Sequence, residues 1–286
     1  MKKIGISTDC MCDLPAEYLA ENDINVLQFY IYTSTGRFWN ESEITSDNIL
    51  EYLGEGNVYL RSNVPEPAEC RDYFEKMLTR YDEVIHITTS DKIGMSHPNA
   101  LAALELMDEN RDRVTLINSG SFSTGLGHMV MRAVTLRDEG RTSAEIAGEC
   151  NGLRGRIVGT VIVPDADHLH RIGYVGRGLR DLCRIFRLHP VLGTTGSGKL
   201  TVKMFGVGNY ERSVLRYATA EFKRNKKTDK GQLFITHAGC PVKIVNEMKE
   251  KADSLCKFDN VTVTKASAVI SSLCGPGTIG IAFVRG

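Results

Sequence analysis

Hydroxyl-bearing and small residues gather between an apolar run and a helical pattern in the first third of the chain: Thr88, Thr89, Ser90, Gly94 and Ser96. If they follow a parallel strand, they lie at its carboxyl end, where open α/β sheets bind ligands. The helix that follows would add N–H groups and a positive dipole, which suit an anion. We therefore expect the head group of a ligand here. The alternative is an ordinary strand-to-helix loop rich in small polar residues.

The elements on either side of this loop must hold it in place. Residues 84–88 form a β-branched run, which indicates a strand buried on both faces. Apolar residues between 100 and 107 have the spacing of one helix face. We expect Ser96 to be the N-cap of this helix and Pro98 to lie just inside it.

The same alternation of strand and helix extends over roughly the first 150 residues, which predicts a parallel sheet with helices on both faces. One of these helices is expected to start after residue 14 with Asp13 as its cap, and residues 61–67 are expected to form a loop. After residue 156 strict alternation gives way to a hairpin and mixed segments. We predict an α/β protein of two domains: an N-terminal α/β domain, 1–155, and a C-terminal α+β domain, 156–286.

Composition narrows the class of protein. Of 286 residues 42% are hydrophobic and 24% are charged, which is typical of a globular protein. Basic and acidic residues number 35 each, so the chain lacks the basic surplus of a duplex nucleic-acid binder. No apolar run approaches the ~20 residues that a transmembrane helix needs. The eight cysteines form no CxxC pair, so we expect neither a zinc nor a redox site, and we expect a reducing cytoplasm.

Two glycine patterns resemble cofactor motifs, and we reject both. Residues 193–199 fit a phosphate-binding loop, but Leu200 stands where Mg²⁺ requires Ser or Thr, and a strand-like run follows. Residues 275–280 fit a dinucleotide pattern, but the chain has no room for the helix and strand that must follow. His168 and His170 lack a third metal ligand at a recognisable spacing. We expect no cofactor and no metal, while a Ser–His–Asp or Cys–His set that meets only in space stays open.

Several short motifs, in order along the whole chain, resemble the DegV family of bacterial fatty-acid-binding proteins. They are TDCMCDLP (8–15), WNESEIT (39–45), the segment 90–100, GLG (125–127), HPVL (189–192) and GPGT (275–278). The resemblance implies a non-catalytic carrier that holds a long-chain fatty acid, or a related anionic lipid, in a ligand cleft between its two domains. It also implies that the carrier presents the acyl carboxylate to a separate fatty acid kinase.

The positions that bind the head group in that family are changed here. Arg61 stands for a threonine, Gly94 for the carboxylate-binding serine, Tyr174 for an arginine and Leu273 for a histidine. We expect Arg61 to bind the ligand's anionic end through charge-assisted hydrogen bonds, the alternative being a surface arginine beside a proline-rich loop. The resemblance implies a ligand site formed by Arg61, Ser62, Ser90, Ile93, Gly94, Met95, Ser96, Tyr174 and Leu273.

A second class of function stays open on the sequence alone. An enzyme acting on a small molecule could use the same cleft, with a thiol or hydroxyl such as Cys10, Cys12 or Ser96 as its reactive group.

Overall fold

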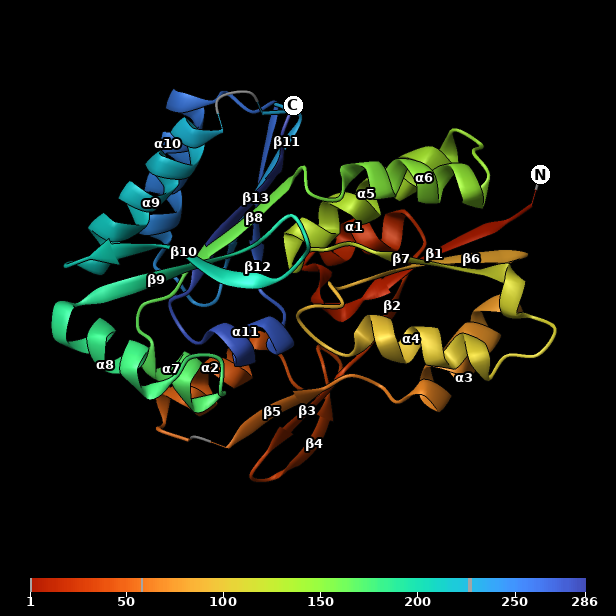
Figure 1. Ribbon diagram of the computed structural model, residues 1–286, viewed down its shortest axis with the longest axis horizontal. Helices are drawn as coiled ribbons and strands as arrows, with labels where there is room; N and C mark the ends of the chain where they lie inside the picture. The colour runs from red at the N-terminus through yellow and green to blue at the C-terminus, as the bar shows by residue number, and fades with distance from the viewer. Residues whose placement is uncertain (1, 58, 226–227) are drawn as a thin grey trace.

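A four-stranded parallel sheet organises the first half of the chain in the computed structural model, which describes residues 2–57, 59–225 and 228–286 (Figure 1). Its strand order is β2-β1-β6-β7. β1 and β6 are almost wholly buried, because helices cover both faces, as the alternating pattern predicts. The strands are β1 (Ile4–Asp9), β2 (Ile24–Leu27), β6 (Glu83–Thr88) and β7 (Val114–Asn118), with the short helix η2 (Arg111–Arg113) before β7.

The helices of this half form two layers around the sheet (Figure 1). One layer holds α3 (Pro67–Leu78) and α4 (Ser96–Glu105), and the other holds α5 (Thr124–Asp138) and α6 (Ser143–Leu153). The turn η1 (Cys10–Cys12) and α1 (Ala16–Glu21) connect β1 to β2. α5 also packs on strands of the second half, so it belongs to the contact between the halves.

A six-stranded mixed sheet organises the second half, in the order β10-β9-β8-β13-β11-β12. Among its pairs only β11 and β12 run parallel, in agreement with the predicted α+β domain. Its strands are β8 (Ile157–Ile162), β9 (Leu188–Thr194), β10 (Leu200–Val207), β11 (Gln232–His237), β12 (Asn260–Lys265) and β13 (Ile279–Val284). Its helices are α7 (Asp167–Arg171), α8 (Arg177–Phe186), α9 (Tyr210–Arg224), α10 (Val242–Leu255) and α11 (Ala268–Cys274).

A small antiparallel sheet of order β4-β3-β5 lies beside both halves (Figure 1). It consists of β3 (Tyr30–Thr33), β4 (Gly36–Trp39) and β5 (Leu60–Asn63), and α2 (Ser46–Gly54) lies in the same region. The sequence predicted a loop at 61–67, and for residues 61–63 this is wrong. They pair with β3, Arg61 opposite Tyr32, and form an edge strand.

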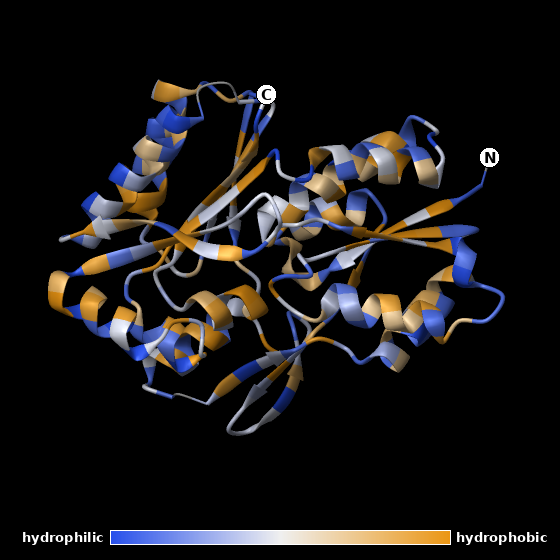
Figure 2. Ribbon diagram, viewed as in Figure 1, coloured by the Kyte–Doolittle hydropathy of each residue, from blue (hydrophilic) through white to orange (hydrophobic). Residues whose placement is uncertain are grey.

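Apolar residues concentrate in the strands of the two large sheets and on the helix faces that cover them (Figure 2). One large cluster takes side chains from both halves of the chain, and a second lies within the six-stranded half. Among the described residues no helix is long and apolar enough to cross a membrane. The core that both halves share is where the candidate site lies.

Candidate functional site

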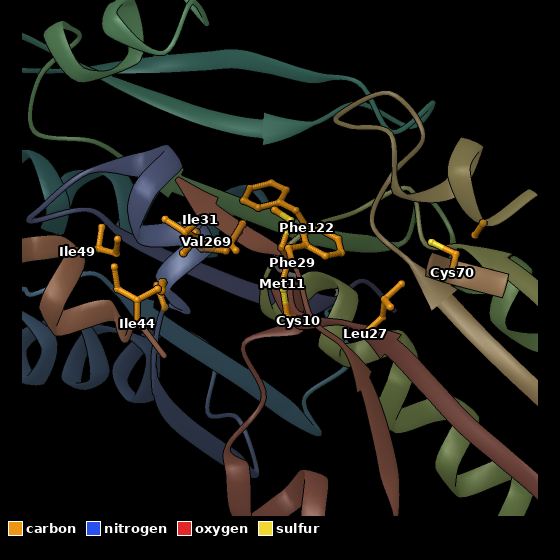
Figure 3. Close-up of a cluster of buried hydrophobic side chains, with 14 of the residues drawn as sticks. Cys10, Met11, Leu27, Phe29, Ile31, Ile44, Ile49, Cys70, Phe122 and Val269 are labelled. Carbon is orange, nitrogen blue, oxygen red and sulfur yellow. The ribbon is translucent and has the colours of Figure 1, made fainter. Parts of the chain in front are cut away.

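An apolar layer fills the space between the two halves. Met11 of η1, Phe29, Phe122 and Val269 of α11 come from distant segments and are each at most 6% exposed (Figure 3). We call this group, with Ile31, Val161, Val163, Leu192 and Ile270, the interdomain layer. Ile93 and Leu273 are half-buried and pack against the same cluster. The structure therefore brings two of the apolar site positions to the margin of this layer.

Asp9 lies at the carboxyl end of β1, at the base of the predicted head-group loop. Its side chain is fully buried and accepts a hydrogen bond from the Thr89 N–H at 2.7 Å and from the Ser96 hydroxyl at 2.7 Å. Ser96 is thus not the N-cap of α4, as the sequence predicted. It is the first helical residue, and Met95 is the N-cap. Because its single proton goes to Asp9, Ser96 can meet a ligand only as a hydrogen-bond acceptor.

Ser7, His86 and Asp9 come together in space beneath this loop, but His86 Nε2 has no hydrogen-bond partner among the described residues, so the three are not joined into a Ser–His–Asp set. The Ser7 hydroxyl lies 2.8 Å from His86 Nδ1, and His86 Nε2 lies 3.4 Å from Asp9 Oδ1. The Ser7 hydroxyl also lies 2.8 Å from the Tyr73 hydroxyl. Ser7, His86 and Asp9 are also all 0% exposed. A substrate cannot reach a nucleophile in this position, so the geometry assigns the three residues to the support of the sheet.

The two thiols that could serve an enzymatic role are also enclosed. Cys10 and Cys12 are both buried in η1. Burial raises the pKa of Cys10 well above its ordinary value, and it raises the pKa of Cys12 to about 12. The thiolate is the nucleophilic form, so at neutral pH neither side chain is an activated nucleophile.

Ser90, a predicted ligand residue, joins the two halves in this structure. Its hydroxyl donates to the Gly198 carbonyl at 2.8 Å. Gly198 lies in the turn between β9 and β10, which confirms that residues 193–199 form a hairpin. At Gly198 φ is +85°, and an added Cβ would lie 2.4 Å from the Ser90 Oγ. The glycine is needed for the turn and for this close approach.

The remaining site positions lie around α11 and the start of α4. Gly94 is exposed, and Met95 and Tyr174 are 58% and 39% exposed. Arg61 is exposed on β5, Ser62 beside it is half-buried, and within the described residues the Arg61 guanidinium has no hydrogen-bond or ion-pair partner. β5 and α7 both contact α11, which carries Leu273. Gly94, Met95, Tyr174 and Arg61 are thus open to solvent, and of these Arg61 lies on an element that contacts α11.

A cap on α11 is the feature that the sequence did not predict. Its first backbone N–H groups donate to side chains of the other half. The Ser267 N–H donates to Asp13 at 2.8 Å, the Ala268 N–H to Glu41 at 2.7 Å and the Val269 N–H to Asn40 at 3.0 Å. We call these three acceptors the α11 cap. They fix the helix that carries both Val269 and Leu273.

Asp13 was expected to cap the helix after residue 14, and this is wrong. The N-cap of α1 is Pro15, and the Asp13 carboxylate instead accepts from the Ser267 N–H and the Ser123 hydroxyl. Burial raises the pKa of Asp13 to about 6, against the lowering effect of these hydrogen bonds. Burial also raises the pKa of Glu41. The sequence signals the role of Asp13 in the α11 cap only through its acidic side chain, because its two partners lie more than 100 positions away.

The two histidines with a possible role as metal ligands have other partners. His168 Nε2 lies 2.8 Å from the Ser272 carbonyl, and His170 Nδ1 lies 2.9 Å from the Val175 carbonyl. The described part of the chain contains no group of three or more His, Cys, Asp or Glu side chains that could hold a metal ion.

Comparison with known proteins gives matches over the whole chain. A family model described as an uncharacterised protein of the DegV family matches residues 3–286. A DegV domain-containing protein of Staphylococcus aureus (strain MRSA252) is 26% identical over 286 residues, which is 100% of both chains. A fatty-acid-binding DegV family protein from Thermus thermophilus superposes with a TM-score of 0.84 at 24% identity, over 99% of this chain and 100% of that one. A DegV family protein from Eubacterium eligens loaded with heptadecanoic acid superposes with a TM-score of 0.85 at 16% identity, over 99% of this chain and 100% of that one.

Proposed function

This chain belongs to the DegV family, and from that premise we propose that it binds a long-chain fatty acid, or a related anionic amphiphile, between its two domains. The observation that carries the proposal is the match over the whole chain to relatives that hold fatty acids. We take residues 1–155 and 156–286 as the two domains, because each large sheet is built within one of these ranges.

The interdomain layer supports the binding of an acyl chain. Side chains from η1, the small sheet and α11 meet there in one buried apolar cluster. Each buried CH₂ of a ligand contributes about 0.8 kcal/mol, so a long chain can bind strongly even with a changed head-group site. Side chains of the layer must move to admit it, because the layer is closed by its own packing.

For the head group, we propose Arg61 as the charged partner. The Ser96 hydroxyl is committed to Asp9 and can only accept, so it cannot neutralise a carboxylate. Arg61 is free of other partners within the described residues and lies on β5, which contacts α11. The N–H groups in the first turn of α4 are further donors for an anion.

We further propose that the protein is a carrier and that a fatty acid kinase acts on the bound carboxylate. The enclosure of Ser7, His86 and Asp9 and the high pKa values of Cys10 and Cys12 support a non-catalytic role. We also propose that it works in the cytoplasm. All eight cysteines are free, and reducing conditions would keep them so.

A thermal-shift titration of delipidated protein tests fatty acid binding. A long-chain saturated fatty acid should raise the melting temperature with concentration, and a short-chain acid with the same head group should not. Leu273→Gln, at the margin of the interdomain layer, should reduce the shift. The matched control is Val242→Gln on α10, where the side chain is 74% exposed. This variant should show the same thermal shift as the wild type. No shift with any long-chain acid would refute the proposal.

A further inference from the structure

A small hollow lies outside the interdomain layer, where the loop between β7 and α5 meets one end of the six-stranded sheet. Its volume is about 190 Å³, and its walls are residues 119–121, parts of β8 and the hairpin turn after β9. That volume lies below the ~300 Å³ of pockets for drug-sized ligands. The hollow therefore suits a small ligand.

Three cations stand around this hollow: Lys203, Arg224 and Arg285. Lys203 is the bulged residue of β10, since the register with β9 shifts between Val202 and Met204. Bulges commonly re-aim a side chain in this way. Of the described residues that line the hollow, Glu221 alone is acidic, so the formal charge of the walls is 3 − 1 = +2.

The hydrogen bonds of these groups leave several donors unused. Arg224 Nη1 donates to Glu221 at 2.9 Å, and Arg285 Nε donates to the Asn225 side chain at 3.0 Å. The other guanidinium nitrogens of both arginines remain available. The Lys203 ammonium has no ion-pair partner within the described residues. A ligand with several acceptor oxygens could therefore be held from more than one side.

The hollow lies where the two halves meet. Ser119, Gly120 and Ser121 of its wall belong to the N-terminal half and the cations to the C-terminal half, so a ligand would contact both. The Ser121 hydroxyl is not one of the donors, because its oxygen is enclosed and lies against Gly125 and Gly159.

We propose that this hollow, the Lys203–Arg285 pocket, binds orthophosphate or the phosphate group of a small monoester. Phosphate oxygens can accept from all three cations. At neutral pH orthophosphate also carries at least one O–H, which can donate to the Glu221 carboxylate, whereas a phosphate monoester, with a second pKa of about 6, mostly lacks one. Sulfate has similar size and charge but no such proton at neutral pH. The Glu221 carboxylate therefore favours phosphate over sulfate.

Isothermal titration calorimetry of the full chain with sodium phosphate, at constant ionic strength, tests this assignment. Saturable binding is expected, and sulfate should bind at least tenfold more weakly. Lys203→Gln and Arg285→Gln should each weaken phosphate binding at least tenfold. Lys223→Gln removes an exposed cation from the same end of α9 outside the pocket and should change nothing. A parallel titration with glycerol phosphate distinguishes free orthophosphate from a phosphate monoester. Whichever of the two binds more tightly is the ligand for which the pocket is built.

Two results would overturn the proposal. One is the absence of saturable binding with a dissociation constant below about 1 mM, because weaker binding does not distinguish a pocket from diffuse surface charge. The other is an equal loss of binding in Lys223→Gln and Arg285→Gln, which would mean that the surface charge acts without a pocket. Melting temperatures without phosphate identify any variant that fails to fold, and Lys203→Gln, at an exposed side chain, then carries the test. Fatty acid binding uses other residues, so either proposal can fail without the other.

Discussion

Replacing Asp13 with asparagine should flatten the dependence of the protein's stability on pH. Asp13 is 6% exposed and accepts hydrogen bonds from the Ser267 N–H and the Ser123 hydroxyl. Burial raises its pKa to about 6. An asparagine has nearly the same shape and can still accept from the Ser267 N–H, but it does not titrate. The change therefore removes the charge and leaves the α11 cap largely in place.

The sign and size of the effect follow from linkage. An aspartate in the unfolded chain has a pKa of about 3.9, so the folded value is raised. Protonated Asp13 therefore contributes to the free energy of unfolding. This contribution is fully present below the pKa of the unfolded chain and is lost as the pH rises through the folded pKa of about 6. Between pH 7 and pH 5 this group should increase the free energy of unfolding by about 1 kcal/mol.

Urea unfolding of both proteins at several pH values between 7 and 5 measures the effect. Carboxyl groups with lowered pKa values, such as Glu83 and Asp91, act in the opposite direction, but they are common to both proteins and cancel in the difference. Asp138→Asn, at a side chain that is 58% exposed, is the control and should reproduce the wild-type curve. Parallel curves for wild type and Asp13→Asn would refute the account of the α11 cap.

Three further outcomes follow from the site. Arg61→Ala should weaken a carboxylated ligand by about ten- to a hundredfold, from the roughly 1.5–3 kcal/mol of a charge-assisted hydrogen bond, and should affect the alcohol of equal chain length much less. Equal losses would show that Arg61 acts through packing. ATP with Mg²⁺ should give no calorimetric signal, because residues 193–199 form a hairpin, and a micromolar affinity abolished by Lys199→Ala would contradict this. Cys10 and Cys12 should react slowly with a thiol reagent in the native protein at neutral pH and quickly after unfolding, and rapid native labelling would contradict their burial.

The parts of the fold that depend on local pattern could be predicted from the sequence. The buried run 84–88, the helix after it and the alternation with neighbouring elements led to the parallel sheet that the structure has. The strand-like residues after Leu200 led correctly to a hairpin in place of a nucleotide loop. In each case the deciding information lies within a few residues, as hydrophobic period or turn chemistry.

The errors share one physical cause, which is a partner from a remote segment. Ser96 and Asp13 each had the residue type and position of a helix cap. Ser96 instead donates to Asp9, 87 positions away, and Asp13 accepts from Ser267, 254 positions away. Residues 61–63 form a strand only because β3 offers an edge. A long-range hydrogen bond that forms on folding outweighs a local preference of about 1 kcal/mol, and no local pattern reveals it.

Native mass spectrometry of the full chain is the most direct test of fatty acid binding. The protein should carry an adduct with the mass of a long-chain fatty acid when purified. Organic extraction should remove that mass, and incubation of the delipidated protein with a long-chain fatty acid should restore it at one ligand per chain. A delipidated protein that keeps its bare mass after incubation with a range of long-chain acids would contradict the proposed function.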